Sequence, residues 1–116
     1  MRSNNKILFI IVIFIINYSC NINCKSYYED EIKDVLIRGI VINKYINYNN
    51  HGNAAIKLKD STGNIKDYSP FCFYGLYEAV QKNDSLCKPS GSLEYRIYRK
   101  DTVIKLYPVI DGDTLR

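Results

Sequence analysis

The sequence predicts a mainly β protein, a small barrel or rolled antiparallel sheet of about six strands with one short helix. Three observations lead to this fold class. Short runs rich in Ile, Val, Leu and Tyr recur along the chain, clusters of Asn, Gly, Asp and Ser separate them, and a single stretch shows helical spacing of apolar residues. If residues 1–19 are removed as a leader, 97 of the 116 residues remain, enough for one domain.

The expected strands share a high content of β-branched and aromatic residues and are bounded by turn-forming residues. They cover residues 35–46, 54–60, 65–68, 85–88, 92–99 and 102–110. In the first strand, Gly39 indicates a bulge or a bend. In the second, Ile56 and Leu58 alternate with two lysines, which is typical of a half-buried strand. Lys100 and Asp101 predict a tight hairpin between the last two strands.

The single helix is expected between the third and fourth strands. Leu76, Tyr77 and Val80 have helical spacing and predict one or two turns at about residues 75–82. The core is expected to combine the apolar face of this helix with the apolar faces of the strands. Its predicted members are Ile40, Val41, Ile56, Leu58, Leu76, Val80, Leu93, Ile97, Ile104 and Leu106.

The first nineteen residues predict export. The apolar run at 7–16 follows two basic residues and has about half the length that a bilayer-spanning helix needs. This is the layout of a signal peptide over residues 1–19. Ser19 supplies the small residue before Cys20, so we expect Cys20 to carry lipid, although Asn17 stands where a lipoprotein signal prefers Leu. The alternatives are simple secretion and an uncleaved anchor.

The segment after Cys20 is predicted to be a tether. Residues 20–34 are polar and acidic with few apolar side chains, and the β domain is expected at 35–116. A short helix around 29–35 is the alternative. The expected location is therefore the outer membrane or the periplasm, with the protein anchored by lipid, and the alternative is a secreted protein.

The charge of the chain argues against a nucleic-acid partner. The formal net charge is +4, and loss of Arg2 and Lys6 with the leader lowers it to +2. The charges are mixed along the sequence, and no basic run of five residues occurs.

The cysteines predict one disulfide and no metal site. With lipid on Cys20, at most two of the other three cysteines can pair within the chain. Cys72 and Cys87 flank the expected helix, and an exported protein meets an oxidising compartment, so we expect these two to pair. The alternative is that both are buried free thiols. The spacings match no zinc pattern, and we expect no metal and no cofactor.

No residue pattern predicts a catalytic centre. His51, the only histidine, lies in a sequence typical of a turn, and no G-x-S-x-G elbow presents a serine. Residues 60–63, DSTG, resemble the aspartic-protease triplet but contain one extra residue. Residues 111–113, DGD, lack the further ligands of a calcium loop. Both segments are expected to be turns, and the protein is expected not to be an enzyme.

The last hairpin offers a candidate binding surface. It consists of Arg96, Tyr98, Arg99 and Lys105, and Tyr and Arg are favoured at interface hot spots. The alternative is that these residues pair across strands with Glu94 on a solvated sheet face. We expect a binding or accessory module of the cell envelope, with an envelope protein or a glycan as partner. The alternative function is an inhibitor or immunity-type protein that blocks a partner enzyme.

Two stretches carry a resemblance to a known group. GIVINKYINYNNHGNAAIKLKD and LYEAVQKNDSLCKPSGSLEYRIYR resemble small exported lipoproteins of unknown function from AT-rich Bacteroidetes genomes. The similar features are turns and strand starts, at Gly39, Asn50-His51-Gly52, Asp84-Ser85 and Gly91-Ser92-Leu93. The resemblance covers most of residues 39–99. It implies an exported, anchored β domain and supplies no activity and no catalytic residues.

Overall fold

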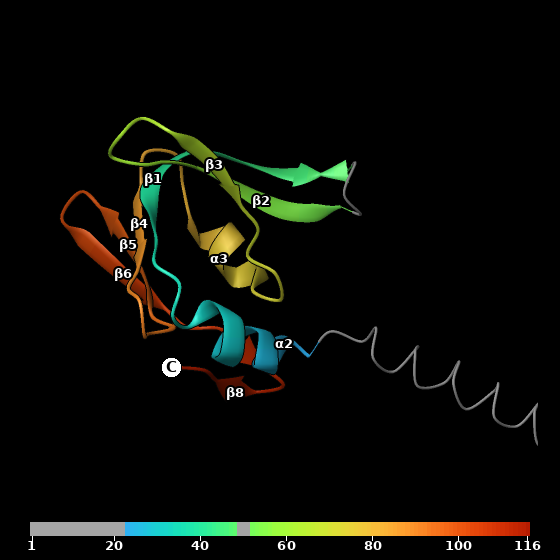
Figure 1. Cartoon of the computed structure of the whole chain (residues 1–116). Coiled ribbons are helices and arrows are strands. Elements are labelled where there is room, and N and C mark those ends of the chain that lie inside the picture. The colour runs from blue at the N-terminus through green and yellow to red at the C-terminus, as the bar shows by residue number, and fades with distance from the viewer. Residues whose placement is uncertain (1–22, 49–51) are drawn as a thin grey trace, which may run out of the picture.

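The computed structural model describes residues 23–48 and 52–116. A six-stranded antiparallel sheet in the order β3-β2-β1-β4-β5-β6 forms the body of the protein (Figure 1). Its strands are β1 (Ile37–Asn47), β2 (Asn53–Lys59), β3 (Ile65–Tyr68), β4 (Ser85–Lys88), β5 (Tyr95–Arg99) and β6 (Thr102–Leu106). A two-stranded hairpin, β7 (Val109–Ile110) and β8 (Asp113–Thr114), follows. The mainly β class is confirmed, and the sheet is rolled without closing into a barrel.

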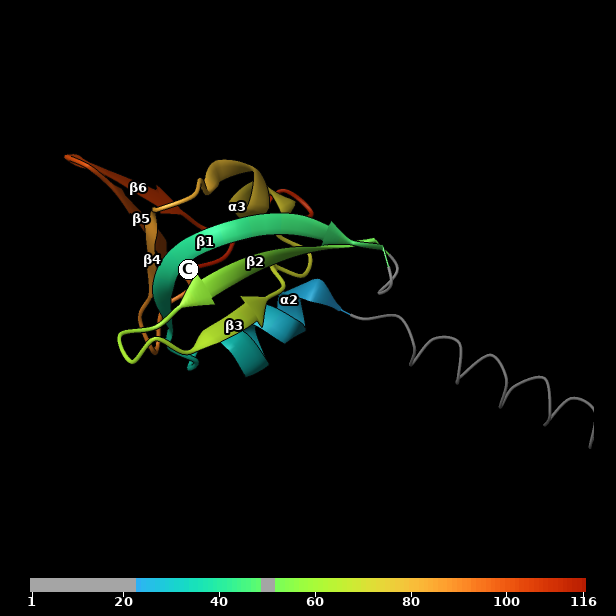
Figure 2. The ribbon, with the colours of Figure 1, turned by 90° about the horizontal axis from the view of Figure 1, so that it is seen from above.

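Within the described residues, three short helices accompany this sheet. They are α2 (Cys24–Ser26), the π-helix η1 (Tyr27–Ile32) and α3 (Tyr74–Ala79). The α3 helix confirms the helix expected at about 75–82, and it lies within the curve of the sheet (Figures 1 and 2). The Nζ of Lys44 on β1 donates to the Tyr77 carbonyl at 2.8 Å, at the end of α3 where helix carbonyls lack partners.

The long strand β1 joins the two halves of the sheet. Its first four residues pair with β4, and residues 40–47 pair with β2. The register shift lies between Val41 and Asn43, three residues beyond the position that Gly39 indicated. Gly39 serves a different purpose. A Cβ there would lie 3.0 Å from the Leu58 Cβ and 3.1 Å from the Lys59 carbonyl oxygen, so β1 and β2 approach closely because this side chain is absent.

The core lies between the sheet, α3 and the N-terminal helices. Of the ten residues expected there, seven are buried, Ile104 and Leu106 are half-buried, and Ile40 is 51% exposed. The prediction for Ile40 is wrong because Ile40 shares a strand face with Arg38, two residues away, while Val41 points inward. Tyr28, Tyr68, Phe73 and Tyr95 add an aromatic group to this core.

The segment after Asn23 is folded onto the domain, which differs from the expected tether. Tyr28 in η1 is fully buried, and its hydroxyl donates to the Phe71 carbonyl. A disulfide joins Cys24 to Cys72 with a Cα–Cα distance of 6.0 Å. The short helix considered as the alternative to a tether is closer to what forms, although it begins earlier in the chain.

The expected disulfide between Cys72 and Cys87 is wrong. Cys72 pairs with Cys24, and Cys87 is a free, half-buried thiol. The reason is the position of the two residues in the fold. Cys72 lies in the loop before α3, next to the N-terminal helices, whereas Cys87 is paired across β4 with Arg38 and Arg96 on the other face of the sheet.

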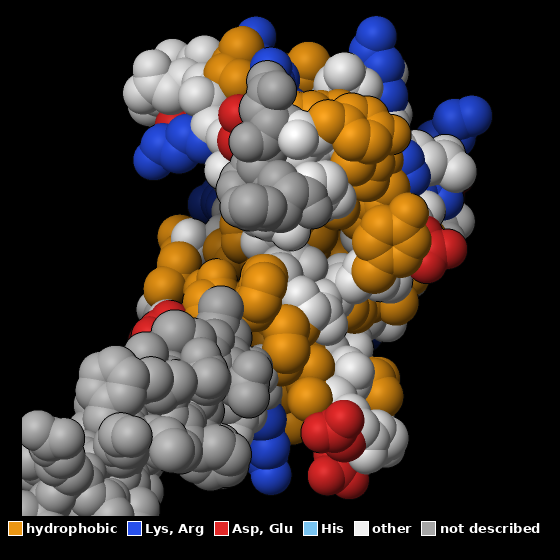
Figure 3. Space-filling view, turned by 90° about the vertical axis from the view of Figure 1, so that its right-hand side faces the viewer, with side chains coloured by type: hydrophobic (Ala, Val, Ile, Leu, Met, Phe, Trp, Pro, Cys, Tyr) orange, Lys and Arg blue, Asp and Glu red, His pale blue; other side chains and the backbone are white. Residues whose placement is uncertain are grey.

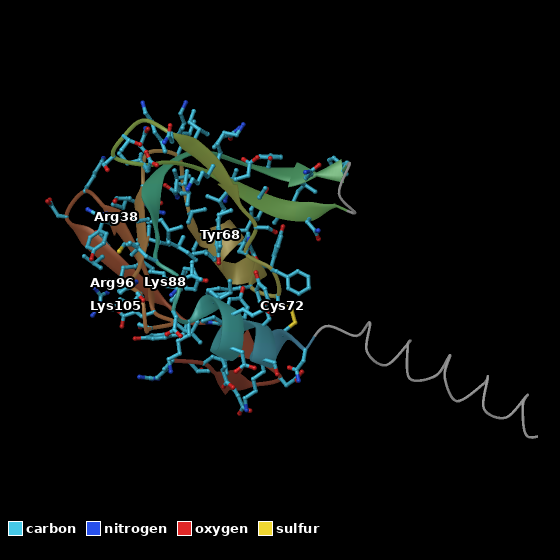
Figure 4. All side chains as sticks on the ribbon, viewed as in Figure 1. Arg38, Tyr68, Cys72, Lys88, Arg96 and Lys105 are labelled. Carbon is cyan, nitrogen blue, oxygen red and sulfur yellow. A yellow bond between two sulfur atoms is a disulfide. The ribbon has the colours of Figure 1, made fainter. Side chains whose placement is uncertain are left out.

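A buried lysine fixes the other end of the N-terminal segment. Lys88 is fully buried, and its Nζ donates to the carbonyls of Lys33 at 2.9 Å, Pro89 at 2.9 Å and Ser92 at 2.7 Å (Figure 4). Three acceptors satisfy the three donors of an ammonium group. Burial lowers the pKa of Lys88. The Ser90 hydroxyl also donates to the Asp34 carbonyl at 2.8 Å, so the end of η1 is held by the β4–β5 loop.

Asp84 forms the main buried ion pair of the described chain. Arg99 donates to its carboxylate through Nε at 2.9 Å and Nη2 at 2.7 Å, and the Gln81 amide donates at 2.7 Å. The Arg99 hydrogen bond is the largest cause that lowers the pKa of Asp84 below its ordinary value of 3.8. A carboxyl with a lowered folded-state pKa stabilises the fold above its unfolded pKa. This stabilisation is lost as the pH falls below about 4.

We expect Asp84→Asn to lower stability by about 2 kcal/mol at pH 7 and to reduce the loss of stability between pH 7 and pH 3. Urea unfolding of wild type and variant at both pH values measures this. Asp101→Asn, an exposed carboxylate in the β5–β6 turn, controls for the removal of one negative charge. Equal acid-induced losses in wild type and Asp84→Asn would contradict the expected role.

Candidate functional site

The outer face of the sheet, turned away from the core, carries a row of basic residues. The strand register pairs Arg38 on β1 with Cys87 on β4, Cys87 with Arg96 on β5, and Arg96 with Lys105 on β6. We call Arg38, Cys87, Arg96 and Lys105 the basic row. With strands about 4.8 Å apart, the row spans about 14 Å across four strands. Like charges on directly opposed residues such as Arg96 and Lys105 destabilise a sheet unless a group of opposite charge lies near them.

An apolar row lies beside the basic row. It consists of the residues two positions away from the members of the basic row on the same four strands, namely Ile40, Ser85, Tyr98 and Val103. The strand register places these residues opposite one another in that order. On the other side of Ile40 the same row continues through Lys59 to Ile65. Four of these side chains are large, apolar and 41–57% exposed, namely Ile40, Ile65, Tyr98 and Val103. Contiguous exposed apolar side chains are typical of interaction surfaces, which makes this row a candidate for one.

A groove opens where the two rows meet β2. It has a volume of about 490 Å³, and its lining includes Leu36, Arg38, Ile40, Lys59 and Asp60. Among the described residues, the side chains of Arg38 and Lys59 have no ion-pair or hydrogen-bond partner. Their charges are therefore available to an acidic group that enters the groove.

Arg96 has a partner of its own. Its Nε donates to Glu94, and the other carboxylate oxygen of Glu94 accepts from the Tyr107 hydroxyl at 2.5 Å. The Tyr107 hydrogen bond, followed by that of Arg96, lowers the pKa of Glu94. The alternative interpretation predicted cross-strand pairing with Glu94, whereas the Arg96–Glu94 pair that forms joins residues two positions apart in the chain. Consequently Arg38 and Lys105 are the cations of the basic row that form no close ion pair among the described residues, although Glu94 also interacts electrostatically with Lys105.

Three of the four expected surface residues lie together in the structure. Arg96, Tyr98 and Lys105 share the outer face, as their alternating positions predicted. Arg99 does not belong to it, because its position places it on the core side, where it pairs with Asp84 and donates to the Ala79 carbonyl at 2.8 Å. The odd-even parity of β5 already separates Arg99 from its neighbours, a signal that the sequence interpretation missed.

Arg38, Ile40 and Lys59 were not expected at the site. The alternation of Arg38 and Ile40 indicated that both share one face, but nothing in the sequence indicates that β1 lies between β2 and β4. Because β1 lies next to β4, Arg38 is in one row with Arg96 and Lys105.

The other segments considered for chemistry are turns. The Asp60 carboxylate accepts from the Thr62 hydroxyl at 2.6 Å and from the amides of Thr62 and Asn64 at 2.9 Å, which confirms the turn interpretation. The Thr62 hydrogen bond is the main cause that lowers the pKa of Asp60. Asp111 and Gly112, with φ of 52° and 83°, form the two-residue turn of the β7–β8 hairpin. His51 and Cys20 lie outside the described residues.

Within residues 23–48 and 52–116, no three His, Cys, Asp or Glu side chains gather as metal ligands would. Over the same residues, none of the helices has the length and apolar character needed to cross a bilayer. Comparisons with protein-family models, with curated proteins and with solved structures found no match.

Proposed function

We propose that this protein is an exported, lipid-anchored binding or accessory module of the cell envelope that binds an acidic partner protein through the outer face of its sheet. The observation that carries the proposal is the juxtaposition of the basic row with the apolar row. A partner of matching chemistry would place carboxylates opposite Arg38 and Lys105 and apolar side chains opposite Ile40 and Tyr98.

The energetics of such a face favour macromolecular binding. Exposed Tyr98 and Ile40 supply apolar area that gains free energy when water is removed. The adjacent cations provide long-range attraction and orient the partner. The backbone of the face belongs to paired strands and is fixed before binding, which reduces the entropy lost on association.

The location rests on the N-terminal sequence. The apolar run at 7–16 and Ser19-Cys20 support a signal peptide with lipid attachment at Cys20. The Cys24–Cys72 disulfide is compatible with an oxidising compartment outside the cytoplasm.

An inhibitor or immunity-type protein is the second candidate function. The rigid, preformed face also suits tight, stoichiometric blocking of a single partner enzyme. The two functions differ in the number of partners and in affinity. One stoichiometric partner favours the inhibitor, whereas several partners or a glycan favour the accessory module.

Photo-crosslinking tests the proposed face. A photo-reactive phenylalanine derivative in place of Tyr98 is expected to yield a discrete crosslinked protein in intact cells. The same replacement of Tyr74, which is also exposed, is the matched control. With the captured partner purified, Arg38→Glu and Lys105→Glu are each expected to weaken binding about tenfold, because attraction becomes repulsion. Higher salt is expected to weaken binding of the wild type.

Lys82→Glu provides the matched charge reversal, since Lys82 is exposed in the loop after α3. It is expected to leave the affinity unchanged. Crosslinking from position 74 and not from position 98, or equal effects of Lys82→Glu and Lys105→Glu, would reject the outer face as the binding surface.

A further inference from the structure

We infer that the end of the domain bearing the Cys24–Cys72 disulfide lies against the lipid bilayer, with the loop at residues 69–74 in the lipid–water interface. The inference rests on the proposed function in one respect, namely that the chain is attached to the membrane before Cys24. It adds an orientation of the domain and a second surface with its own ligand, the bilayer.

Only a short length of chain connects the attachment point to the folded domain. Cys24 is covalently fixed to Cys72, and the Asn23 side chain caps α2 by accepting from the Ser26 amide at 3.2 Å. Three residues separate Cys20 from Cys24. Fully extended, this stretch reaches about 14 Å, whereas a free tether of about 14 residues would have a root-mean-square span of about 20 Å. The disulfide therefore keeps this end close to the membrane surface.

The N-terminal segment is held against the domain at several points. Tyr28 is fully buried in the core, and Lys88 holds the Lys33 carbonyl at the end of η1. The segment is thus fixed at its beginning, its middle and its end. The point where the chain leaves the domain has one position relative to the sheet.

The surface beside the disulfide differs in its chemistry from the outer face of the sheet. A groove of about 410 Å³ there is lined by nine residues, none of them charged. They include Pro70, Phe71, Cys72, Phe73 and Tyr74 of the loop at residues 69–74. The groove on the outer face, in contrast, is lined by Arg38, Lys59 and Asp60 among others.

Aromatic rings dominate this end. Tyr74 is 56% exposed and its ring lies 5.2 Å from that of Tyr77, while the rings of Tyr27 and Phe71 are 5.6 Å apart. Figure 3 shows a band of apolar side chains along this side of the molecule. Rings with an apolar body and a polar hydroxyl are enriched where hydrocarbon meets water, at the depth of the lipid headgroups.

The orientation that follows presents the outer face to the aqueous side. Cys72 lies at the end where the described chain begins, and Arg38, Arg96 and Lys105 lie at the opposite side (Figure 4). With the disulfide end on the bilayer, the basic row and the apolar row point away from it. A partner can then reach them without competition from lipid.

Fluorescence in brominated lipid tests the orientation. The chain contains no tryptophan, so Tyr74→Trp and Tyr98→Trp each introduce a single probe at an exposed tyrosine. The full-length proteins are reconstituted into phosphatidylethanolamine–phosphatidylglycerol vesicles with and without bromine on the acyl chains. The probe at position 74 is expected to lose about half of its emission in brominated vesicles and to shift to the blue, whereas the probe at 98 stays unchanged. Phe71→Trp gives a second probe at the same end if Tyr74→Trp folds poorly.

Flotation of the same vesicles separates the two proposals. Flotation with quenching at 74 or 71 and not at 98 supports the orientation. Flotation with equal quenching at both ends, or with none at 74 and 71, overturns the orientation while the anchor stands. Failure to float overturns the anchor, and the orientation with it.

Discussion

Removal of the Cys24–Cys72 disulfide is expected to lower the free energy of unfolding by about 4 kcal/mol. The bond closes a loop between residues 48 positions apart, and loops of this length restrict the unfolded chain strongly. The effect is expected to be large relative to total stability, since small domains are stabilised by about 5–15 kcal/mol. The variant Cys24→Ala/Cys72→Ala, compared with wild type by urea unfolding under non-reducing conditions, measures it.

Cys87→Ala is the matched control for loss of a thiol, because Cys87 is free and half-buried. It is expected to change stability far less than the double variant does. The N-terminal helices should remain partly docked in the double variant, since Tyr28 and Lys88 still hold them, and hydrogen exchange of residues 24–32 reports this. A stability equal to wild type, under conditions where mass spectrometry shows the native disulfide in the wild type, would contradict the assigned contribution.

Ile97→Ala is expected to destabilise the protein by about 2–5 kcal/mol, whereas Ile40→Ala should cost less than about 0.5 kcal/mol. The substitution is the same at both sites and each residue lies within a paired strand. Ile97 is fully buried among core residues, and Ile40 is 51% exposed on the outer face. Only the truncation at 97 removes buried contacts and leaves a cavity.

Thermal and urea unfolding of both variants give the comparison. A large loss at Ile40 and a small one at Ile97 would mean that β1 and β5 present their opposite faces to the core, and the apolar row would then not exist. Ile40→Ala is also expected to weaken partner binding while leaving stability intact, which separates a binding role from a structural one.

Local patterns predicted most of the secondary structure. The alternation of Ile56 and Leu58 with lysines identified β2 and its buried face, and the helical spacing of Leu76 and Val80 identified α3. Turn-forming residues located the hairpin at Lys100 and Asp101 between β5 and β6. These features depend on neighbours within a few residues, so their physical causes are present in the sequence itself.

The presence of a strand was easier to predict than the face of the sheet on which each of its side chains lies. Ile40 was assigned to the core because it is apolar, although its parity with Arg38 indicated the outer face. Arg99 was assigned to the surface because it is charged, although its parity with Ile97 indicated the core side. In both cases the position along the strand decided the outcome, because successive side chains point to opposite faces whatever their chemistry.

The sequence by itself determined the mainly β class, the approximate positions of the six strands of the main sheet and the outward placement of Arg96, Tyr98 and Lys105. It did not separate β7 from β6, which were expected as one strand at 102–110. Only the tertiary structure decided which strands are neighbours, and therefore that Arg38 completes the basic row and that Ile40 completes the apolar row. It also decided that Cys72 pairs with Cys24 and that the N-terminal segment docks through Tyr28. These outcomes depend on contacts between residues 40 or more positions apart. Such contacts form only when the whole chain folds and buries its apolar surface, so local sequence patterns do not indicate them.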